Sequence, residues 1–147
     1  MSAYLREANI DDAKIILQWR NDSLTRENSF SKDLIDPETH IRWFNSKLSD
    51  KKCSMFIMMD GTEKVGQLRI DRVNEIGEIS YMIAPNKRKM GYGKQIIKLA
   101  EGAVSSNIKV LVGLVESFNE ASKKCFIIND YSEFTGGDIT CYIKLLK

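Results

Sequence analysis

Seven short segments of the chain carry the alternating or continuous apolar pattern that is typical of β-strands. They span residues 3–8, 55–59, 65–70, 76–84, 110–115, 133–135 and 139–145. Within residues 76–84, Ile79, Tyr81 and Ile83 share one face, while Glu78 lies on the other. This alternation of apolar and polar positions predicts a half-buried strand.

Four longer segments place apolar residues three and four positions apart, which is the spacing of an amphipathic helix. They span residues 9–19, 36–48, 93–104 and 119–128. Two of them begin with capping residues, since Asn9 is followed by Asp12 and Asp36 precedes Pro37. Residues 23–35 have weak periodicity and predict a short helix followed by a loop. Strands and helices in this order predict a mixed α/β fold.

The length of 147 residues fits a single domain, which we expect to span residues 1–147. With 43% hydrophobic and 29% charged residues, disordered and coiled-coil classes are disfavoured. No apolar run approaches the roughly 20 residues of a membrane-spanning helix, and the first residues lack the build of a signal peptide. The sequence therefore predicts a cytoplasmic protein without a membrane partner.

Charge and cysteine content exclude further classes of function. The 22 basic and 20 acidic residues give a net charge of +2, which is too balanced to predict a nucleic-acid partner. Cys53, Cys125 and Cys141 are odd in number and lack metal-ligand spacing, and His40 is the one histidine. We therefore expect neither a metal site nor a disulfide framework.

A basic, glycine-containing loop follows the strand of residues 76–84 and opens the next helix. The free N–H groups at a helix start attract phosphate, and glycine lets the backbone approach an anion closely. Two known phosphate motifs do not fit, because Ile96 replaces the third glycine of a dinucleotide fingerprint and Gln95 replaces the Ser/Thr of a P-loop. The loop is either an anion site or an ordinary helix start with solvated lysines.

Two motifs resemble those of the GNAT superfamily of N-acetyltransferases. The run Arg88-Lys89-Met90-Gly91-Tyr92-Gly93 is similar to its Arg/Gln-x-x-Gly-x-Gly/Ala signature, and it stands between a strand and a helix as in that family. Asn119-Glu120-Ala121-Ser122 resembles the Asn-x-x-Ala/Ser motif farther along. The order of the predicted elements also matches. The resemblance implies a single-domain α/β GNAT fold, with a mixed, mostly antiparallel, twisted sheet of about seven strands flanked by four helices.

The resemblance further implies acetyl-CoA as co-substrate, without a metal. Its pyrophosphate would lie on the amides at the helix start, and its pantetheine arm would run along the strand edge. The cofactor-binding residues implied in this way are Met82, Ile83, Ala84, Arg88, Lys89, Met90, Gly91, Tyr92, Gly93, Lys94, Asn119, Ser122 and Lys123. Amides near Met82 and Ile83 would stabilise the tetrahedral oxyanion.

Acetyl transfer to an amine requires removal of a proton, because an amine with a pKa near ~10 is mostly protonated at neutral pH. Glu78 stands where the family often carries a base; an exposed glutamate or an ion pair is the alternative. Many relatives place a proton-donating tyrosine seven positions after the motif asparagine, but this position is Phe126. Tyr131 and Tyr92 could substitute for it, although the sequence favours a packing role for each.

The first two helices form the acceptor pocket in this superfamily. Arg20, Asn21, His40 and Trp43 lie on them, in a pattern similar to amino-sugar-nucleotide and ribosomal-protein N-acetyltransferases. Arginine suits phosphate, and tryptophan can cover a sugar or base. Core packing and helix-surface roles are the alternatives for Trp43 and His40.

We therefore expect direct acetyl transfer to a primary amine, with a nucleotide-linked amino sugar as first acceptor. A protein N-terminus or small amine, or a non-catalytic acyl-CoA binding domain, are the alternatives. The sequence predicts no oligomeric state.

Overall fold

The computed structural model describes residues 3–146 and contains one seven-stranded sheet with the order β1-β2-β3-β4-β5-β7-β6. The strands are β1 Ala3–Glu7, β2 Cys53–Asp60, β3 Glu63–Val73, β4 Ile76–Ile83, β5 Val110–Glu116, β6 Ser132–Gly136 and β7 Ile139–Leu145. All neighbours are antiparallel except β4 and β5, which run parallel. The predicted mixed, mostly antiparallel sheet of seven strands is confirmed.

The predicted helices are also confirmed, together with the short helix expected after residue 23. They are α1 Ala13–Arg20, α2 Ser23–Glu27, α3 Pro37–Ser49, α4 Tyr92–Ala103 and α5 Glu120–Ile127, with 3-10 turns η1 Ile10–Asp12 and η2 Pro85–Lys87. The predicted caps form as expected, since the side chains of Asn9 and Asp12 cap reciprocally and Asp36 accepts from the Thr39 amide. The first turn of the first predicted helix is a 3-10 turn.

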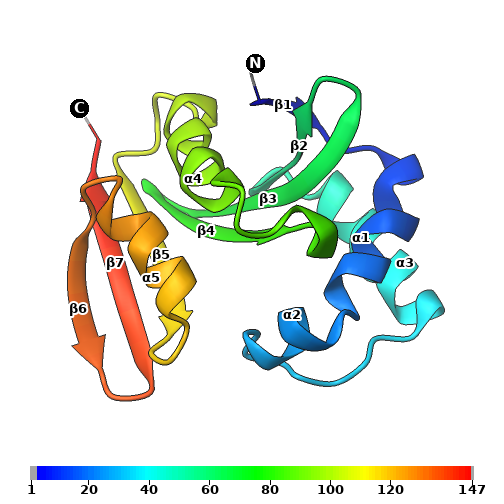
Figure 1. The fold of residues 1–147 in the computed structure, drawn as a ribbon. Coiled ribbons are helices and arrows are strands. Elements are labelled where there is room, and N and C mark those ends of the chain that lie inside the picture. The colour runs from blue at the N-terminus through cyan, green and yellow to red at the C-terminus, as the bar shows by residue number, and fades with distance from the viewer. Residues whose placement is uncertain (1–2, 147) are drawn as a thin grey trace.

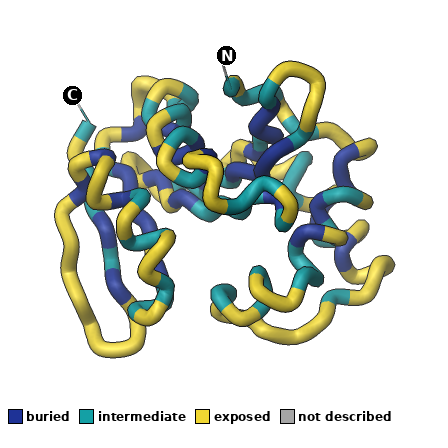
Figure 2. Tube along the Cα trace, in the orientation of Figure 1, coloured by how far each residue is buried: buried dark blue, intermediate teal, exposed yellow. Residues whose placement is uncertain are grey.

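Helices cover both faces of the sheet and divide the apolar side chains into two cores (Figure 1). On one face α4 and α5 pack through side chains such as Ile96 and Phe126, which are almost fully buried. On the other face Ile16 of α1 and Phe44 of α3 pack against Ile57 of β2. The β6 strand and the loop after α2 stay exposed (Figure 2).

The sheet opens between β4 and β5. These strands pair only where Ile76–Ile79 faces Val110–Gly113. Beyond Ile79, β4 continues beside β3 alone and β5 continues beside β7 alone. Figure 1 shows the two strands diverging, with α5, β6 and β7 on one side of the opening and α1 to α3 on the other. A free strand edge therefore lies in the middle of the sheet, where another extended chain can pair.

Candidate active site

The start of α4 lies at the end of this free edge and has the geometry of an anion site. Gly91 is its N-cap, with a left-handed φ of 84°, and no side chain caps the helix. A Cβ on Gly91 would meet only Gln95 Nε2, at 3.8 Å, so the backbone conformation and not crowding requires glycine. The first amides of this twelve-residue helix thus remain available for an anionic group.

The cationic side chains of the loop have two kinds of surroundings, since some are exposed to solvent and one contacts α2. Lys89 and Lys94 are exposed beside the helix start. Arg88 turns to α2 instead, because its Nη2 donates to Asp22 Oδ2 at 2.5 Å and to Thr25 Oγ1 at 2.8 Å. The hydrogen bond from Arg88 lowers the pKa of the Asp22 carboxyl. Arg88 therefore connects this loop to the start of α2.

Along β4, the backbone N–H and C=O groups of every second residue face β3, and those of the residues between them face the opening. The Ala84 amide donates to Val65 of β3 at 2.8 Å, so by strand alternation the amides of Tyr81 and Ile83 face the opening. Of the two amides expected to stabilise an oxyanion, that of Ile83 therefore has the right direction, while that of Met82 faces β3.

The start of α5 faces the same opening. Asn119 caps α5 by accepting from the Ser122 amide at 3.3 Å, which leaves its side-chain NH₂ group available as a donor. Lys123 Nζ donates to the Ser117 carbonyl at 3.1 Å and pairs with Glu120 at 3.2 Å. The Ser122 hydroxyl lies 2.8 Å from the hydroxyl of Tyr81 on β4, so the two side chains bridge the opening.

Glu78 lies one residue before the strands part, on the face of β4 away from α4. It is exposed, pairs in register with Asp71 and Val112, and makes no hydrogen bond or ion pair with residues 3–146. Burial and the nearby charge of Glu78 raise the pKa of Cys141 on β7. The carboxylate is thus free to accept a proton beside the free edge, and the ion-pair alternative is not seen.

Phe126 is a packing residue. Its ring is 1% exposed, stacks on Tyr142 at 5.0 Å, and meets Tyr131 edge-on at 5.1 Å. A Cβ on Gly113 would lie 2.3 Å from Phe126 Cζ, so the tip of the ring rests on the β5 backbone. A hydroxyl at this tip has no room, which gives a physical reason for phenylalanine at position 126.

Tyr81 is a polar side chain beside the opening that sequence reasoning did not single out. It alternates with Ile79 and Ile83, so the pattern assigns it to the apolar face and conceals its polar tip. Besides meeting Ser122, the hydroxyl would lie 3.7 Å from a Cβ on Gly93, in the first turn of α4. Burial raises the pKa of Tyr81, so it stays protonated.

Two guanidinium groups, from Arg20 of α1 and Arg69 of β3, lie close to the indole ring of Trp43 on α3. The central carbons of Arg20 and Arg69 lie 5.0 Å and 5.2 Å from the centre of the Trp43 ring. Arg69 pairs with Asp71 at 2.8 Å. Arg20 has no carboxylate partner within 4.0 Å anywhere in residues 3–146, and burial and the charge of Arg69 lower its pKa. Arg20 is therefore a partly buried cation without a matching anion.

The other two predicted acceptor residues support the scaffold. His40 is 1% exposed, and its Nε2 donates to the Ala13 carbonyl at 2.7 Å, which joins α3 to α1. His40 therefore lies in the core between α1 and α3, and neither in a pocket nor on the helix surface. Asn21 uses both ends of its amide on the backbone of Ile35, at 2.9 Å each. Arg20 and Trp43 remain as the acceptor-binding candidates.

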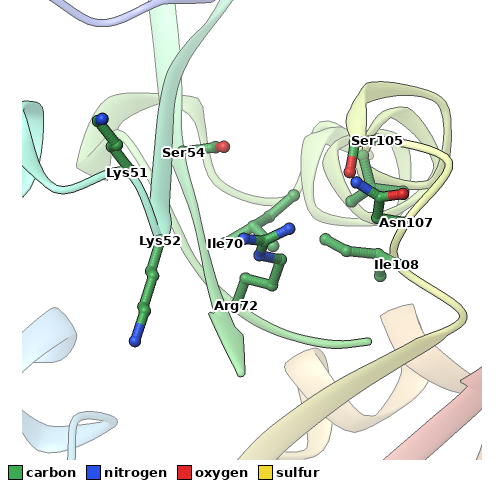
Figure 3. Close-up of a pocket in the computed structure, with 9 residues that line it drawn as sticks. Lys51, Lys52, Ser54, Ile70, Arg72, Ser105, Asn107 and Ile108 are labelled. Atoms are coloured by element: carbon green, nitrogen blue, oxygen red, sulfur yellow. The ribbon is translucent and has the colours of Figure 1, made fainter. Parts of the chain in front are cut away.

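A separate cavity of about 300 Å³ lies near the far end of β3 (Figure 3). Lys51, Lys52, Arg72 and Asn107 are among its lining residues, and the two lysines point in opposite directions. Its cationic groups therefore do not converge on one point. Among residues 3–146, no cluster of His, Cys, Asp and Glu could hold a metal ion, and no helix is long and apolar enough to cross a membrane.

Comparisons with known proteins identify the family and the fold of this chain. The family model described as "Acetyltransferase (GNAT) domain" matches residues 3–127. The "Uncharacterized N-acetyltransferase YfmK" of Bacillus subtilis (strain 168) is 28% identical over 116 residues, which cover 78% of this chain and 75% of the relative.

Two solved structures share the whole fold at low sequence identity. A spermidine N-acetyltransferase from Vibrio cholerae, in complex with CoA and spermine, is 16% identical with a TM-score of 0.87, covering 97% of this chain and 95% of that one. The aminoglycoside acetyltransferase AAC(6')-Ib, in complex with ribostamycin and coenzyme A, is 13% identical with a TM-score of 0.86, covering 99% and 94%. The chain therefore belongs to the GNAT acetyltransferase family and is an N-acetyltransferase.

Proposed function

We propose that this enzyme acetylates the primary amine of an acceptor that carries phosphate, with a nucleotide-linked amino sugar as the first candidate. The observation that carries the proposal is the unpaired guanidinium of Arg20. A partly buried charge without a partner is unfavourable, and an anionic ligand relieves that cost. The planar guanidinium matches phosphate through two hydrogen bonds, and Trp43 supplies a flat face for a sugar or base.

The same charges disfavour a polycationic acceptor. The two structural neighbours named above are complexed with spermine and with an aminoglycoside, both of which carry several amines. Here Arg20 and Arg69 lie on the same indole ring. A second cation about 6 Å from Arg20 would cost about 3 kcal/mol at an effective dielectric constant of about 20. We therefore expect polyamines to bind this site weakly.

For the donor, we propose that acetyl-CoA places its pyrophosphate on the amides at the start of α4, where Gly91 provides the required turn. Exposed Lys89 and Lys94 are the cations near this point. The pantetheine arm runs beside Met82 to Ala84, where the backbone of Ile83 at the end of β4 faces the opening and can pair with it, and the free NH₂ of Asn119 donates to it. The full proposed set also contains Ile83, Arg88, Met90, Tyr92, Gly93, Ser122 and Lys123.

For the chemistry, we propose that Glu78 takes the proton from the attacking amine, directly or through water. Its carboxylate is exposed and unpaired at the point where β4 and β5 part. The nitrogen then attacks the thioester carbonyl, and the oxyanion accepts a hydrogen bond from the Ile83 amide that faces the opening. Proton removal of this kind contributes roughly 10²–10⁴-fold to rate.

The test is a parallel turnover assay on nucleotide-linked amino sugars, free amino sugars, polyamines and short peptides. We expect a nucleotide-linked amino sugar to be the fastest. Arg20→Ala should raise its KM about 10-fold or more, since a hydrogen bond to a charged group contributes about 1.5–3 kcal/mol, while the KM for acetyl-CoA stays nearly constant.

Arg42→Ala is the matched control, because Arg42 is exposed on α3 beside Trp43 and should leave both constants unchanged. Turnover of peptides or polyamines with every sugar nucleotide inert would contradict the proposed acceptor, while leaving the family assignment intact.

A further inference from the structure

We propose that the Tyr81 hydroxyl donates the hydrogen bond and the proton that the departing CoA sulfur requires. This inference depends on acetyl-CoA as the donor and not on the identity of the acceptor. It assigns to β4 a role that position 126 on α5 cannot fill, because Phe126 has no hydroxyl.

The position of Tyr81 in the fold is the first argument. Tyr81 lies two residues beyond Ile79, the last residue of β4 that pairs with β5. Its side chain extends from the free edge to α5, where its hydroxyl meets Ser122 Oγ at 2.8 Å. A thioester that pairs with this edge must therefore pass beside the Tyr81 side chain.

The surroundings of the hydroxyl give the second argument. The Tyr81 ring lies 6.3 Å from the Phe126 ring in an edge-on arrangement, and both its hydroxyl and the Cys125 thiol lie beside Gly93 in the first turn of α4. Ser122 can donate to or accept from the Tyr81 oxygen, because a hydroxyl does both. Ser122 thus keeps the phenol oriented and can return a proton to it.

The other four tyrosines have different surroundings. Tyr4 donates to the Gly61 carbonyl, Tyr92 donates to Asp60, and Tyr142 donates to Glu133. Tyr131 has no hydrogen-bond partner for its hydroxyl in residues 3–146.

Tyr131 nevertheless lies in the wrong place. Lys144 Nζ lies 5.6 Å from the centre of the Tyr131 ring and pairs with Glu101 at 3.0 Å, so the Tyr131 ring lies near the last turn of α4. Glu101 stands nine positions after Tyr92 at the start of α4, or roughly 13 Å along the helix. The two substitutes expected from the sequence, Tyr92 and Tyr131, are therefore less well placed than Tyr81.

When the tetrahedral intermediate collapses, the C–S bond breaks and its electron pair goes to sulfur. The sulfur takes the proton of the Tyr81 hydroxyl, and the phenolate recovers a proton from water through Ser122, while the proton that Glu78 took from the amine neutralises the resulting hydroxide. The nitrogen, which has lost its proton to Glu78, keeps the acetyl group as an amide. The products are free CoA thiol and the N-acetylated amine.

The decisive experiment titrates the thiol of CoA bound to the enzyme, following thiolate absorbance in the ultraviolet. A hydrogen bond from Tyr81 stabilises the thiolate, so the pKa of the bound thiol should be lower in wild type than in Tyr81→Phe by about one unit or more. Tyr131→Phe is the matched control, since it removes a buried hydroxyl next to Phe126 that has no hydrogen-bond partner among residues 3–146, and its bound CoA should titrate as in wild type.

Turnover gives the second measurement, with hydroxylamine as a small nucleophile that needs no acceptor pocket. We expect kcat to fall on the order of 10²-fold in Tyr81→Phe, with the Kd for CoA and the melting temperature close to wild type. Equal thiol pKa values in wild type and Tyr81→Phe would overturn the proposal. A loss of CoA affinity that accounts for the whole loss of activity would also overturn it, because Tyr81 would then only shape the site.

Discussion

Gly113→Ala tests how Phe126 and the parted strands fit together. The added Cβ would lie 2.3 Å from Phe126 Cζ and 2.5 Å from Cε1, whereas carbon atoms in contact prefer about 3.5–4.0 Å. The ring cannot retreat freely, because Tyr142 stacks on it and Tyr131 meets it edge-on. Overpacking typically costs about 1–3 kcal/mol, and an overlap above 1 Å places this substitution near 3 kcal/mol.

The assay is urea and thermal unfolding against a matched substitution on α4. Gly102→Ala adds the same methyl group where nothing lies within 4 Å, and should stabilise the helix by up to about 1 kcal/mol. For a chain of this size, 3 kcal/mol corresponds to a fall in Tm of roughly 6–12 °C.

A double-mutant cycle isolates the contact itself. In a Phe126→Leu background, Gly113→Ala should cost less than about 1 kcal/mol, because the shorter side chain leaves room for the methyl group. A neutral Gly113→Ala, or an equal cost in both backgrounds, would refute the explanation offered for phenylalanine at position 126.

Two further predictions concern proton equilibria. Glu78→Gln should lower turnover at neutral pH by about 10²-fold, leave the Kd for CoA unchanged, and recover partly at high pH, where the free amine is abundant; an unchanged pH–rate profile would remove Glu78 from the mechanism. Burial alone would raise the pKa of Asp12, but hydrogen bonds from Arg6, the Asn9 amide and Lys64 at 2.8–3.0 Å lower it well below its usual range. The contribution of the Asp12 carboxylate to the free energy of unfolding is therefore fully present above about pH 4 and is lost as pH falls further. Asp12→Asn should thus reduce the loss of stability that unfolding experiments measure between about pH 5 and pH 2. An identical dependence of stability on pH in the variant and in wild type would contradict this.

The sequence predicts most of the fold because its signals are local. The alternation in β4, the caps at Asn9 and Asp36, and the glycine that starts α4 each depend on residues a few positions apart. The alternation also predicts that Glu78 lies on the polar face of its strand, where it is exposed, while its role as a base comes from the family resemblance and stays a prediction.

The side-chain partners were not predictable from the sequence, since tertiary packing sets them. Arg88 meets Asp22 across 66 residues, His40 meets the Ala13 carbonyl across 27, and Tyr81 meets Ser122 across 41. Local periodicity contains no information on such distant pairs. Polar groups on apolar faces, such as the hydroxyl of Tyr81, are therefore the residues that sequence patterns conceal.

Calorimetric titration of CoA into wild type, Gly91→Val and Gly137→Val tests most directly whether the cofactor binds at the start of α4. Both glycines have left-handed φ angles, 84° and 79°, so valine strains the backbone at each, but Gly137 lies in the β6–β7 turn and not at the start of α4. The account predicts tight binding to wild type and Gly137→Val, and binding at least 10-fold weaker to Gly91→Val. Equal affinity of all three proteins for CoA would contradict it.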